Sequence, residues 1–150
     1  MIKVLIADDH AVIRRGLKQL LDAEADMKEA DEARNAHEAL DLASKKQHDV
    51  LLLDIDMPGR SGLEALKALK VQRPDLPVLV LSFHHEEQFA TRVLKAGAAG
   101  YLTKENAPEE LVKAIRQVYG GRKYISSSMG EKLSTHRTSP NNGGGQKSKL

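Results

Sequence analysis

The chain has 150 residues, of which 41% are hydrophobic and 29% charged, so it is long enough for one domain with a sizeable core. It contains no cysteine, which excludes disulfides and thiolate metal sites, and no apolar run of membrane-spanning length. The net charge of +2 arises at one end: residues 120–150 carry six Lys or Arg and one Glu, whereas residues 1–119 carry 17 basic and 20 acidic side chains. The basic balance therefore gives no reason to expect nucleic-acid binding by the folded part.

Continuous apolar runs, which are typical of parallel strands covered on both faces, recur along the first 102 residues. A further strand is needed near 28–33, where the charged sequence KEADEA favours a position at the edge of the sheet. The clear runs predict four strands, at 2–7, 50–53, 78–81 and 100–102.

Amphipathic helical patterns fill the intervals between these strands. Gly97 lies just past one predicted helix end, and Pro108 stands in the first turn of another. The alternation of strands and helices predicts a doubly wound α/β fold with right-handed crossovers. The predicted apolar helix faces are Val12, Ile13, Leu17, Leu20 and Leu21; then Leu63, Leu66 and Leu69; then Phe89, Val93 and Leu94; and finally Leu111, Ile115 and Val118.

The composition changes after Ile125, where Ser, Asn and Gly dominate and large apolar residues are few. A short helical turn near 128–133 is compatible with the sequence. Such a segment buries too little apolar surface to offset the entropy of ordering it. We therefore expect one folded domain over residues 1–125 and a linker or disordered tail over residues 126–150.

Polar side chains stand where the predicted strands end. Because ligands of open parallel sheets bind beyond the carboxyl ends of the strands, these side chains are expected to share one site. Three of them are carboxylates, whose mutual repulsion a divalent cation would remove. The strand-end residues are Asp8 and Asp9, Asp54, Ser82, and Thr103 with Lys104.

This set predicts a site for Mg²⁺ and a phosphoryl group. Asp54 precedes the turn sequence MPG, which leaves its side chain at the rim of the sheet, where it can act as a nucleophile toward phosphorus. Asp8 and Asp9 would then hold the metal. Lys104 can pair with an anionic group, and Ser82 can donate a hydrogen bond to a phosphoryl oxygen.

The chain resembles the receiver domain of bacterial two-component response regulators, closest to the subfamily with a LuxR-type helix-turn-helix output domain. The resemblance implies a flavodoxin-like, doubly wound sheet of five parallel strands in the order 2-1-3-4-5, with helices on both faces. It rests on IADDH (6–10), LLLDIDMPG (51–59), VLVLS (78–82), KAGAAGYLTK (95–104) and APEELVKAI (107–115).

The resemblance also implies roles for individual residues. Asp54 is the phosphoacceptor, Lys104 and Ser82 contact the phosphoryl group, and Ser82 and Tyr101 form the switch, in which the aromatic ring turns inward on activation. Glu105 stands where many receivers have proline, and Asp56 and His84 occupy variable positions that flank the site. The implied Mg²⁺ ligands are Asp8, Asp9, Asp54 and the backbone carbonyl of Asp56.

The implied partner is a sensor histidine kinase, and a homodimer is one option for assembly. We expect a cytoplasmic protein with no membrane association that catalyses only its own phosphorylation and dephosphorylation. The residues after Ile125 are too few and too polar for a helix-turn-helix, so DNA contact and transcription control are expected only through an output domain missing from this chain.

Two other functions stay open on the sequence. Asp54 and Asp56 form a D-x-D motif that also resembles the nucleophile motif of haloacid-dehalogenase-type phosphatases, although in that family the motif normally lies near the N-terminus rather than at mid-chain. The chain could also be a receiver-like interaction module that takes no phosphate. A dinucleotide-binding domain is disfavoured because no G-x-G-x-x-G follows the first strand. His10 is interpreted as a structural residue that opens the first helix, and His84 as solvated or capping.

Overall fold

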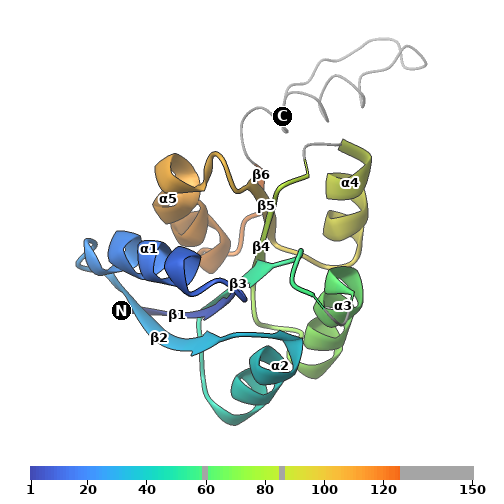
Figure 1. Cartoon of the computed structure of the whole chain (residues 1–150), viewed down its shortest axis with the longest axis horizontal. Coiled ribbons are helices and arrows are strands. Elements are labelled where there is room, and N and C mark those ends of the chain that lie inside the picture. Colours follow the sequence, from blue (N-terminus) through green and yellow to red (C-terminus); the bar gives the residue numbers. More distant parts are fainter. Residues whose placement is uncertain (59–60, 85–86, 126–150) are drawn as a thin grey trace.

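The structure, a computed structural model, describes residues 1–58, 61–84 and 87–125. Its strands and helices alternate along the chain, and short loops connect them (Figure 1). The strands are β1 (Ile2–Ala7), β2 (Met27–Ala33), β3 (Val50–Asp54), β4 (Val78–Ser82), β5 (Gly100–Thr103) and β6 (Tyr124–Ile125). The helices are α1 (Ala11–Asp22), α2 (Ala36–Lys45), α3 (Gly62–Gln72), α4 (Glu87–Lys95) and α5 (Ala107–Tyr119).

All strands of the described part pair in parallel, in the order β2-β1-β3-β4-β5-β6. The predicted order of the first five strands is confirmed, whereas the predicted total of five is wrong because β6 adds a sixth. This strand has two residues, too few to show in a sequence pattern, and contacts with α5 and β5 hold it in place. The Tyr124 amide donates to the carbonyl of Ala99 at 3.0 Å, and its hydroxyl donates to Glu110 Oε1 at 2.7 Å.

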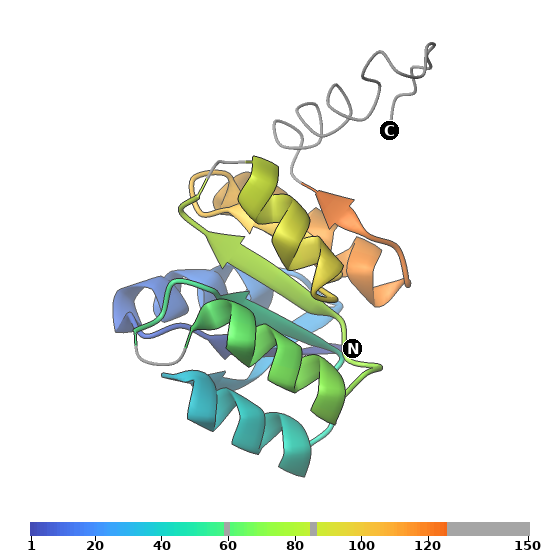
Figure 2. The same cartoon turned by 90° about the vertical axis from the view of Figure 1, so that its right-hand side faces the viewer.

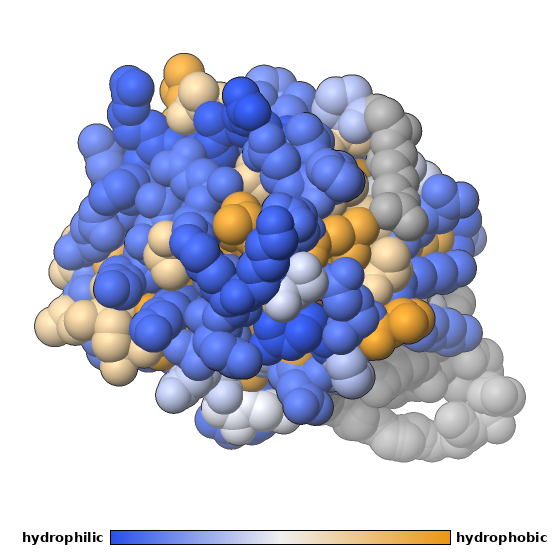
Figure 3. Space-filling model, turned by 90° about the horizontal axis from the view of Figure 1, so that it is seen from below, coloured by the Kyte–Doolittle hydropathy of each residue, from blue (hydrophilic) through white to orange (hydrophobic). Residues whose placement is uncertain are grey.

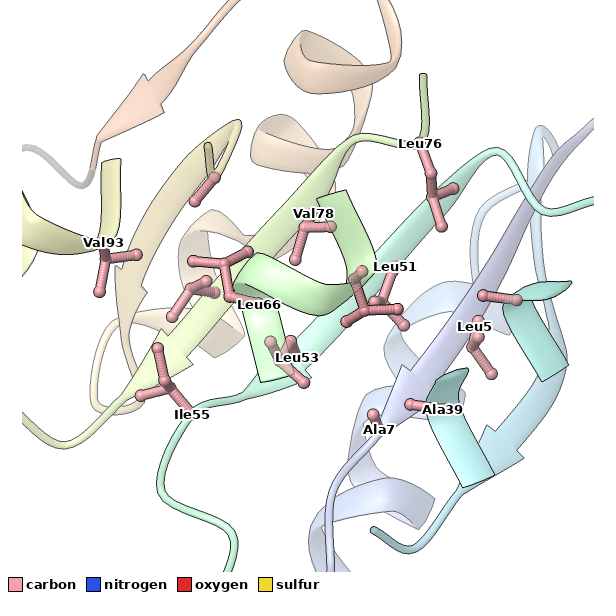
Figure 4. Close-up of a cluster of buried hydrophobic side chains, with 14 of the residues drawn as sticks. Leu5, Ala7, Ala39, Leu51, Leu53, Ile55, Leu66, Leu76, Val78 and Val93 are labelled. Atoms are coloured by element: carbon pink, nitrogen blue, oxygen red, sulfur yellow. The ribbon is translucent and has the colours of Figure 1, made fainter. Parts of the chain in front are cut away.

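Two helical layers cover the sheet, with α1 and α5 on one face and α2, α3 and α4 on the other (Figures 1 and 2). Successive strand residues point to opposite faces, so each central strand contributes to both hydrophobic layers. Figure 4 shows the second layer, in which strand residues such as Leu5 and Leu53 pack toward Ala39 of α2, Leu66 of α3 and Val93 of α4. Burial on both faces explains the continuous apolar runs of β3 and β4.

The local signals at the helix ends are mostly confirmed. Pro108 lies in the first turn of α5, and Gly97, with φ of +112°, follows the end of α4 in a conformation that favours glycine. Val12, however, is 79% exposed, so its assignment to the apolar face of α1 is wrong. The buried side chains of α1 are Leu17 and Leu21, which are spaced four residues apart.

The face in Figure 3 is mainly hydrophilic, with apolar side chains in separate small areas. Among the residues that the structure describes, no helix is long and apolar enough to cross a membrane.

The charged segment near 28–33 forms β2, an edge strand of the sheet, as predicted. One buried carboxylate oxygen of Glu29 has no hydrogen-bond partner among the described residues. Burial, together with the neighbouring carboxylate of Glu32, raises the pKa of Glu29 from 4.5 to about 7. Because the folded state binds this proton more tightly than the unfolded chain, the stability associated with Glu29 falls as the pH rises from about 4.5 to about 7.

Replacement of Glu29 with Gln should therefore raise the melting temperature at pH 8 and change it little at pH 4.5. The amide keeps the shape of the protonated acid and removes the penalty of a buried negative charge. Thermal unfolding followed by circular dichroism between pH 4.5 and 8 measures the effect, with Glu64→Gln on the exposed surface of α3 as the control. An effect of Glu29→Gln that does not grow with pH would contradict this interpretation.

Candidate functional site

The polar strand ends lie together at one edge of the sheet. Asp54 and Ser82 are the last residues of β3 and β4, one residue beyond the predicted strand ends. Asp54 pairs in register with Leu81, and Ser82 with Thr103, so neighbouring parallel strands deliver their polar residues to the same level. These residues lie at the common edge predicted from the sequence, because the carboxyl ends of parallel strands lie on the same side of the sheet.

Carboxylates gather at this edge with little access to solvent. Asp8 is fully buried, and Asp54 is 1% exposed. Asp8, Asp9, His10 and Asp54 each offer one potential ligand atom, and these atoms all lie within 4.8 Å of one another. Oδ2 of Asp8 and Oδ2 of Asp54 are buried and have no hydrogen-bond partner among the described residues. A group of buried, unpaired carboxylate oxygens fits a divalent cation, so this acidic cluster could hold a metal.

Lys104 contributes a positive charge to the cluster. Its Nζ lies 2.9 Å from Oδ1 of Asp54, and its side chain is 8% exposed. The ammonium also sits 4.3 Å from the centre of the Phe83 ring, whose face attracts cations. Burial raises the pKa of Asp54 above its ordinary value, and the charge of Asp8 adds to this effect, while Lys104 and the amide of Asp56 offset part of it.

The Asp56 side chain connects the loop after β3 to the loop after β4. Its Oδ2 accepts a hydrogen bond from the amide of Phe83 at 3.0 Å, and its Oδ1 lies 3.3 Å from Nε2 of His84. The amide of Asp56 in turn donates to Oδ1 of Asp54 at 2.9 Å. Asp56 and His84, identified in the sequence as flanking positions, therefore contact each other beside the cluster. The predicted metal contact of the Asp56 carbonyl stays a prediction.

Ser82 and Tyr101 both contact the backbone of His84. The amide of His84 donates to Oγ of Ser82 at 2.9 Å, and the hydroxyl of Tyr101 donates to the carbonyl of His84 at 2.8 Å. Both side chains are buried, so the ring of Tyr101 lies inside the structure and packs edge-on against Phe89 at a centroid distance of 6.2 Å. The two predicted switch residues are thus joined through one loop residue.

Some residues of this edge were not identified as functional from the sequence. The aromatic ring of Phe83 is 58% exposed and lies over Lys104, and its position directly after Ser82 was the only available signal. Thr103 was expected at this edge as a strand-end residue but without an individual role, and its hydroxyl is buried without a hydrogen-bond partner among the described residues. His10, interpreted as structural, brings a ring nitrogen into the carboxylate cluster.

An apolar groove of about 490 Å³ adjoins the cluster, between α1 and the start of α5. Lys104 and Phe83 line the end nearest the carboxylates. The apolar side chains along the groove come mainly from Ile13, Leu17, Leu20, Ala107 and Pro108.

Comparison with known sequences identifies relatives that are longer than this chain. It is 41% identical over 140 residues to the response regulator GacA of Pseudomonas aeruginosa, an alignment that covers 93% of this chain and 65% of GacA. It is 37% identical over 140 residues to the response regulator UvrY of Escherichia coli, with 93% and 64% covered. The chain thus spans just under two thirds of the length of these curated relatives.

Solved structures share the fold. A LuxR-family two-component response regulator from Aurantimonas sp. SI85-9A1 superposes with a TM-score of 0.85 at 30% identity, covering 90% of this chain and 96% of that one. The isolated REC domain of RcsB from Salmonella enterica serovar Typhimurium in the apo form gives 0.81 at 26% identity, covering 89% and 98%.

The family itself follows from a match over most of the chain. A family model described as the response regulator receiver domain matches residues 4–116, a range that includes the whole carboxylate cluster and Lys104. This match and the sequence relatives confirm the resemblance predicted from the motifs, and the chain belongs to the response regulator receiver domain family.

Proposed function

We propose that this chain is the phosphoryl-accepting switch of a two-component signalling system, with Asp54 as the acceptor and bound Mg²⁺ as an ion that assists the transfer. One observation carries the proposal: the buried Asp54 carboxylate lies 2.9 Å from Lys104 and shares a cluster within 4.8 Å with Asp8 and Asp9. A nucleophilic carboxylate, a cation for the phosphoryl oxygens and two acids suited to Mg²⁺ are the parts that phosphoryl transfer needs.

The geometry favours one oxygen of Asp54 as the nucleophile. Oδ1 already contacts Lys104 and the amide of Asp56, whereas Oδ2 has no hydrogen-bond partner among the described residues. As Oδ2 forms its bond to phosphorus, the bond from phosphorus to the imidazole nitrogen or acetate oxygen of the donor breaks. Bound Mg²⁺ would neutralise the charge that gathers between the carboxylates and the phosphoryl oxygens. Hydrolysis of the acyl phosphate returns Asp54 to its original state.

The switch follows from the shared contacts of His84. A phosphoryl group on Asp54 needs hydrogen-bond donors, and the Ser82 hydroxyl at the end of the adjacent strand can become one. To donate, the Ser82 side chain would have to turn toward the phosphoryl group, and its Oγ would then leave the His84 amide from which it now accepts a hydrogen bond. The loop that Tyr101 also contacts would move as a result. We infer that Tyr101 and this loop alternate between two arrangements and thereby alter the surface around α4, β5 and α5.

The proposed partner is a sensor histidine kinase, and the groove between α1 and α5 supports it. The apolar lining begins at Lys104, so a kinase element that packs there would present its phosphohistidine close to Asp54. Proteins similar to this chain are named response regulators, and one solved structure is described as two RcsB dimers bound to two parallel DNAs. We therefore propose that this cytoplasmic receiver forms homodimers and controls transcription through an output domain outside these 150 residues.

Incubation with acetyl phosphate and Mg²⁺ tests the proposal. We expect the intact mass to increase by one phosphoryl group per chain, and we expect EDTA to prevent the increase and hydroxylamine to reverse it, because hydroxylamine cleaves acyl phosphates. A haloacid-dehalogenase-type phosphatase would instead release phosphate from small esters over many turnovers. Absence of any Mg²⁺-dependent mass increase would contradict the proposed function.

A further inference from the structure

His10 lies between β1 and α1 with its imidazole inside the carboxylate cluster. Its Nδ1 is 3.3 Å from Oδ1 of Asp8 and 3.2 Å from Oδ1 of Asp9. The same ring belongs to the group whose ligand atoms, Asp54 included, lie within 4.8 Å of one another. The cluster thus offers a nitrogen donor in addition to its carboxylate oxygens.

The side chain of His10 does not cap the first helix. His10 occupies the N-cap position of α1, yet its side chain forms no capping hydrogen bond. Its backbone is nevertheless held firmly, because its amide donates to Oδ1 of Asp8 at 2.8 Å and its carbonyl accepts from the amide of Arg14 at 3.0 Å. Arg14 also donates through Nη1 to the carbonyl of Asp8 at 2.7 Å. The turn therefore fixes the imidazole beside the carboxylates while 59% of the side chain stays exposed to solvent.

The other described histidines with ionic contacts lack such an arrangement. His48 contacts Asp31, which also pairs with Lys46, and His84 contacts the carboxylate of Asp56. Within the part of the chain that the structure describes, the cluster at His10 is the only group of acidic and histidine side chains with the spacing of a metal site. The buried, unpaired Oδ2 atoms of Asp8 and Asp54 are a second, independent indication of a cation there.

We propose that His10 is a direct ligand of the ion at this site and that it shifts the preference of the site from Mg²⁺ toward divalent first-row transition-metal ions. The proposal rests on the metal site of the proposed function and adds a ligand to it. Oxygen-only sites suit Mg²⁺, whereas an imidazole nitrogen binds transition-metal ions better than it binds Mg²⁺. The Nδ1 atom can reach an ion held by Asp8 and Asp9 because it already lies next to an oxygen of each.

Titration calorimetry with Mn²⁺ and with Mg²⁺ on the whole chain measures this preference. We expect wild type to bind Mn²⁺ more tightly than Mg²⁺, and His10→Ala to lose about tenfold in Mn²⁺ affinity while its Mg²⁺ affinity changes much less. His37→Ala removes an exposed histidine of α2 and serves as the matched control. Equal losses for both ions in His10→Ala would mean that His10 only positions the carboxylates, and would overturn the proposal.

Pulsed electron paramagnetic resonance of the Mn²⁺ complex examines the bond itself. A ligating imidazole gives a ¹⁴N modulation of the electron spin echo, which we expect in wild type and His37→Ala and not in His10→Ala. Mn²⁺ binding without nitrogen modulation in wild type would refute the ligand role of His10 and leave the proposed function standing. Failure of every variant to bind either ion would instead contradict the metal site, and with it the proposed function.

Discussion

Asp54→Asn should abolish Mg²⁺-dependent phosphorylation by acetyl phosphate, with a rate at least about a thousandfold below that of wild type. The amide nearly matches the carboxylate in shape, so contacts with Lys104 and the amide of Asp56 can persist in altered form, but its nitrogen or neutral oxygen is a poor nucleophile. Intact-mass measurement over time gives both rates. The effect is large because the substitution removes the reacting atom rather than a group that assists it.

Asp56→Asn is the matched control for this substitution, since it makes the same change two residues away. The Asp56 side chain contacts the backbone amide of Phe83 and the ring of His84. Asp54 is contacted by the backbone amide of Asp56 and not by its carboxylate. We expect this variant to retain phosphorylation, with a changed rate of phosphate loss. Labelling that survives in Asp54→Asn, or is abolished equally in Asp56→Asn, would disprove the assignment of the acceptor. The second outcome would favour a D-x-D phosphatase.

Most of the sheet could be predicted from the sequence because its central strands are buried on both faces. Strands β3 and β4 are buried throughout, and such burial leaves a continuous apolar run that no solvent-exposed segment shows. Strand β6 could not be predicted, since its two residues carry no periodicity and are positioned by contacts with Ala99 and Glu110. The exposure of Val12 likewise depends on how α1 rotates against the sheet, which its own sequence leaves undetermined.

The candidate site was predictable to the extent that strand ends determine it. Because parallel strands end on one side, Asp54, Ser82 and Lys104 had to lie near one another once the strands were identified. The contacts between Asp56 and His84, and the ring of Phe83 above Lys104, depend on loop paths and side-chain rotamers. No sequence pattern encodes these features. The position of His10 Nδ1 beside the carboxylates of Asp8 and Asp9 likewise depends on the side-chain rotamer and could not be predicted from the sequence.

Lys104→Met should slow phosphorylation by acetyl phosphate by about one to two orders of magnitude and lower the melting temperature in the absence of Mg²⁺. Methionine keeps most of the apolar stem and removes the charge. Without that charge, the buried carboxylate of Asp54 faces Asp8 with its main cationic partner gone, which raises its pKa further and reduces the fraction available as nucleophile. The phosphoryl group also loses a cation that would stabilise it in the transition state.

The response to Mg²⁺ separates this explanation from general loss of packing. Lys104 and a bound divalent ion neutralise the same carboxylates, so they substitute for each other in part, and Mg²⁺ should raise the melting temperature of Lys104→Met by more than that of wild type. Lys67→Met, on the exposed surface of α3, removes one positive charge elsewhere and should behave as wild type in both measurements. If Lys104→Met gained no extra stabilisation from Mg²⁺, the ammonium and the ion would not act on a shared set of carboxylates. The Lys104 side chain, whose Nζ lies 2.9 Å from Oδ1 of Asp54, would then stabilise the protein only through its packing.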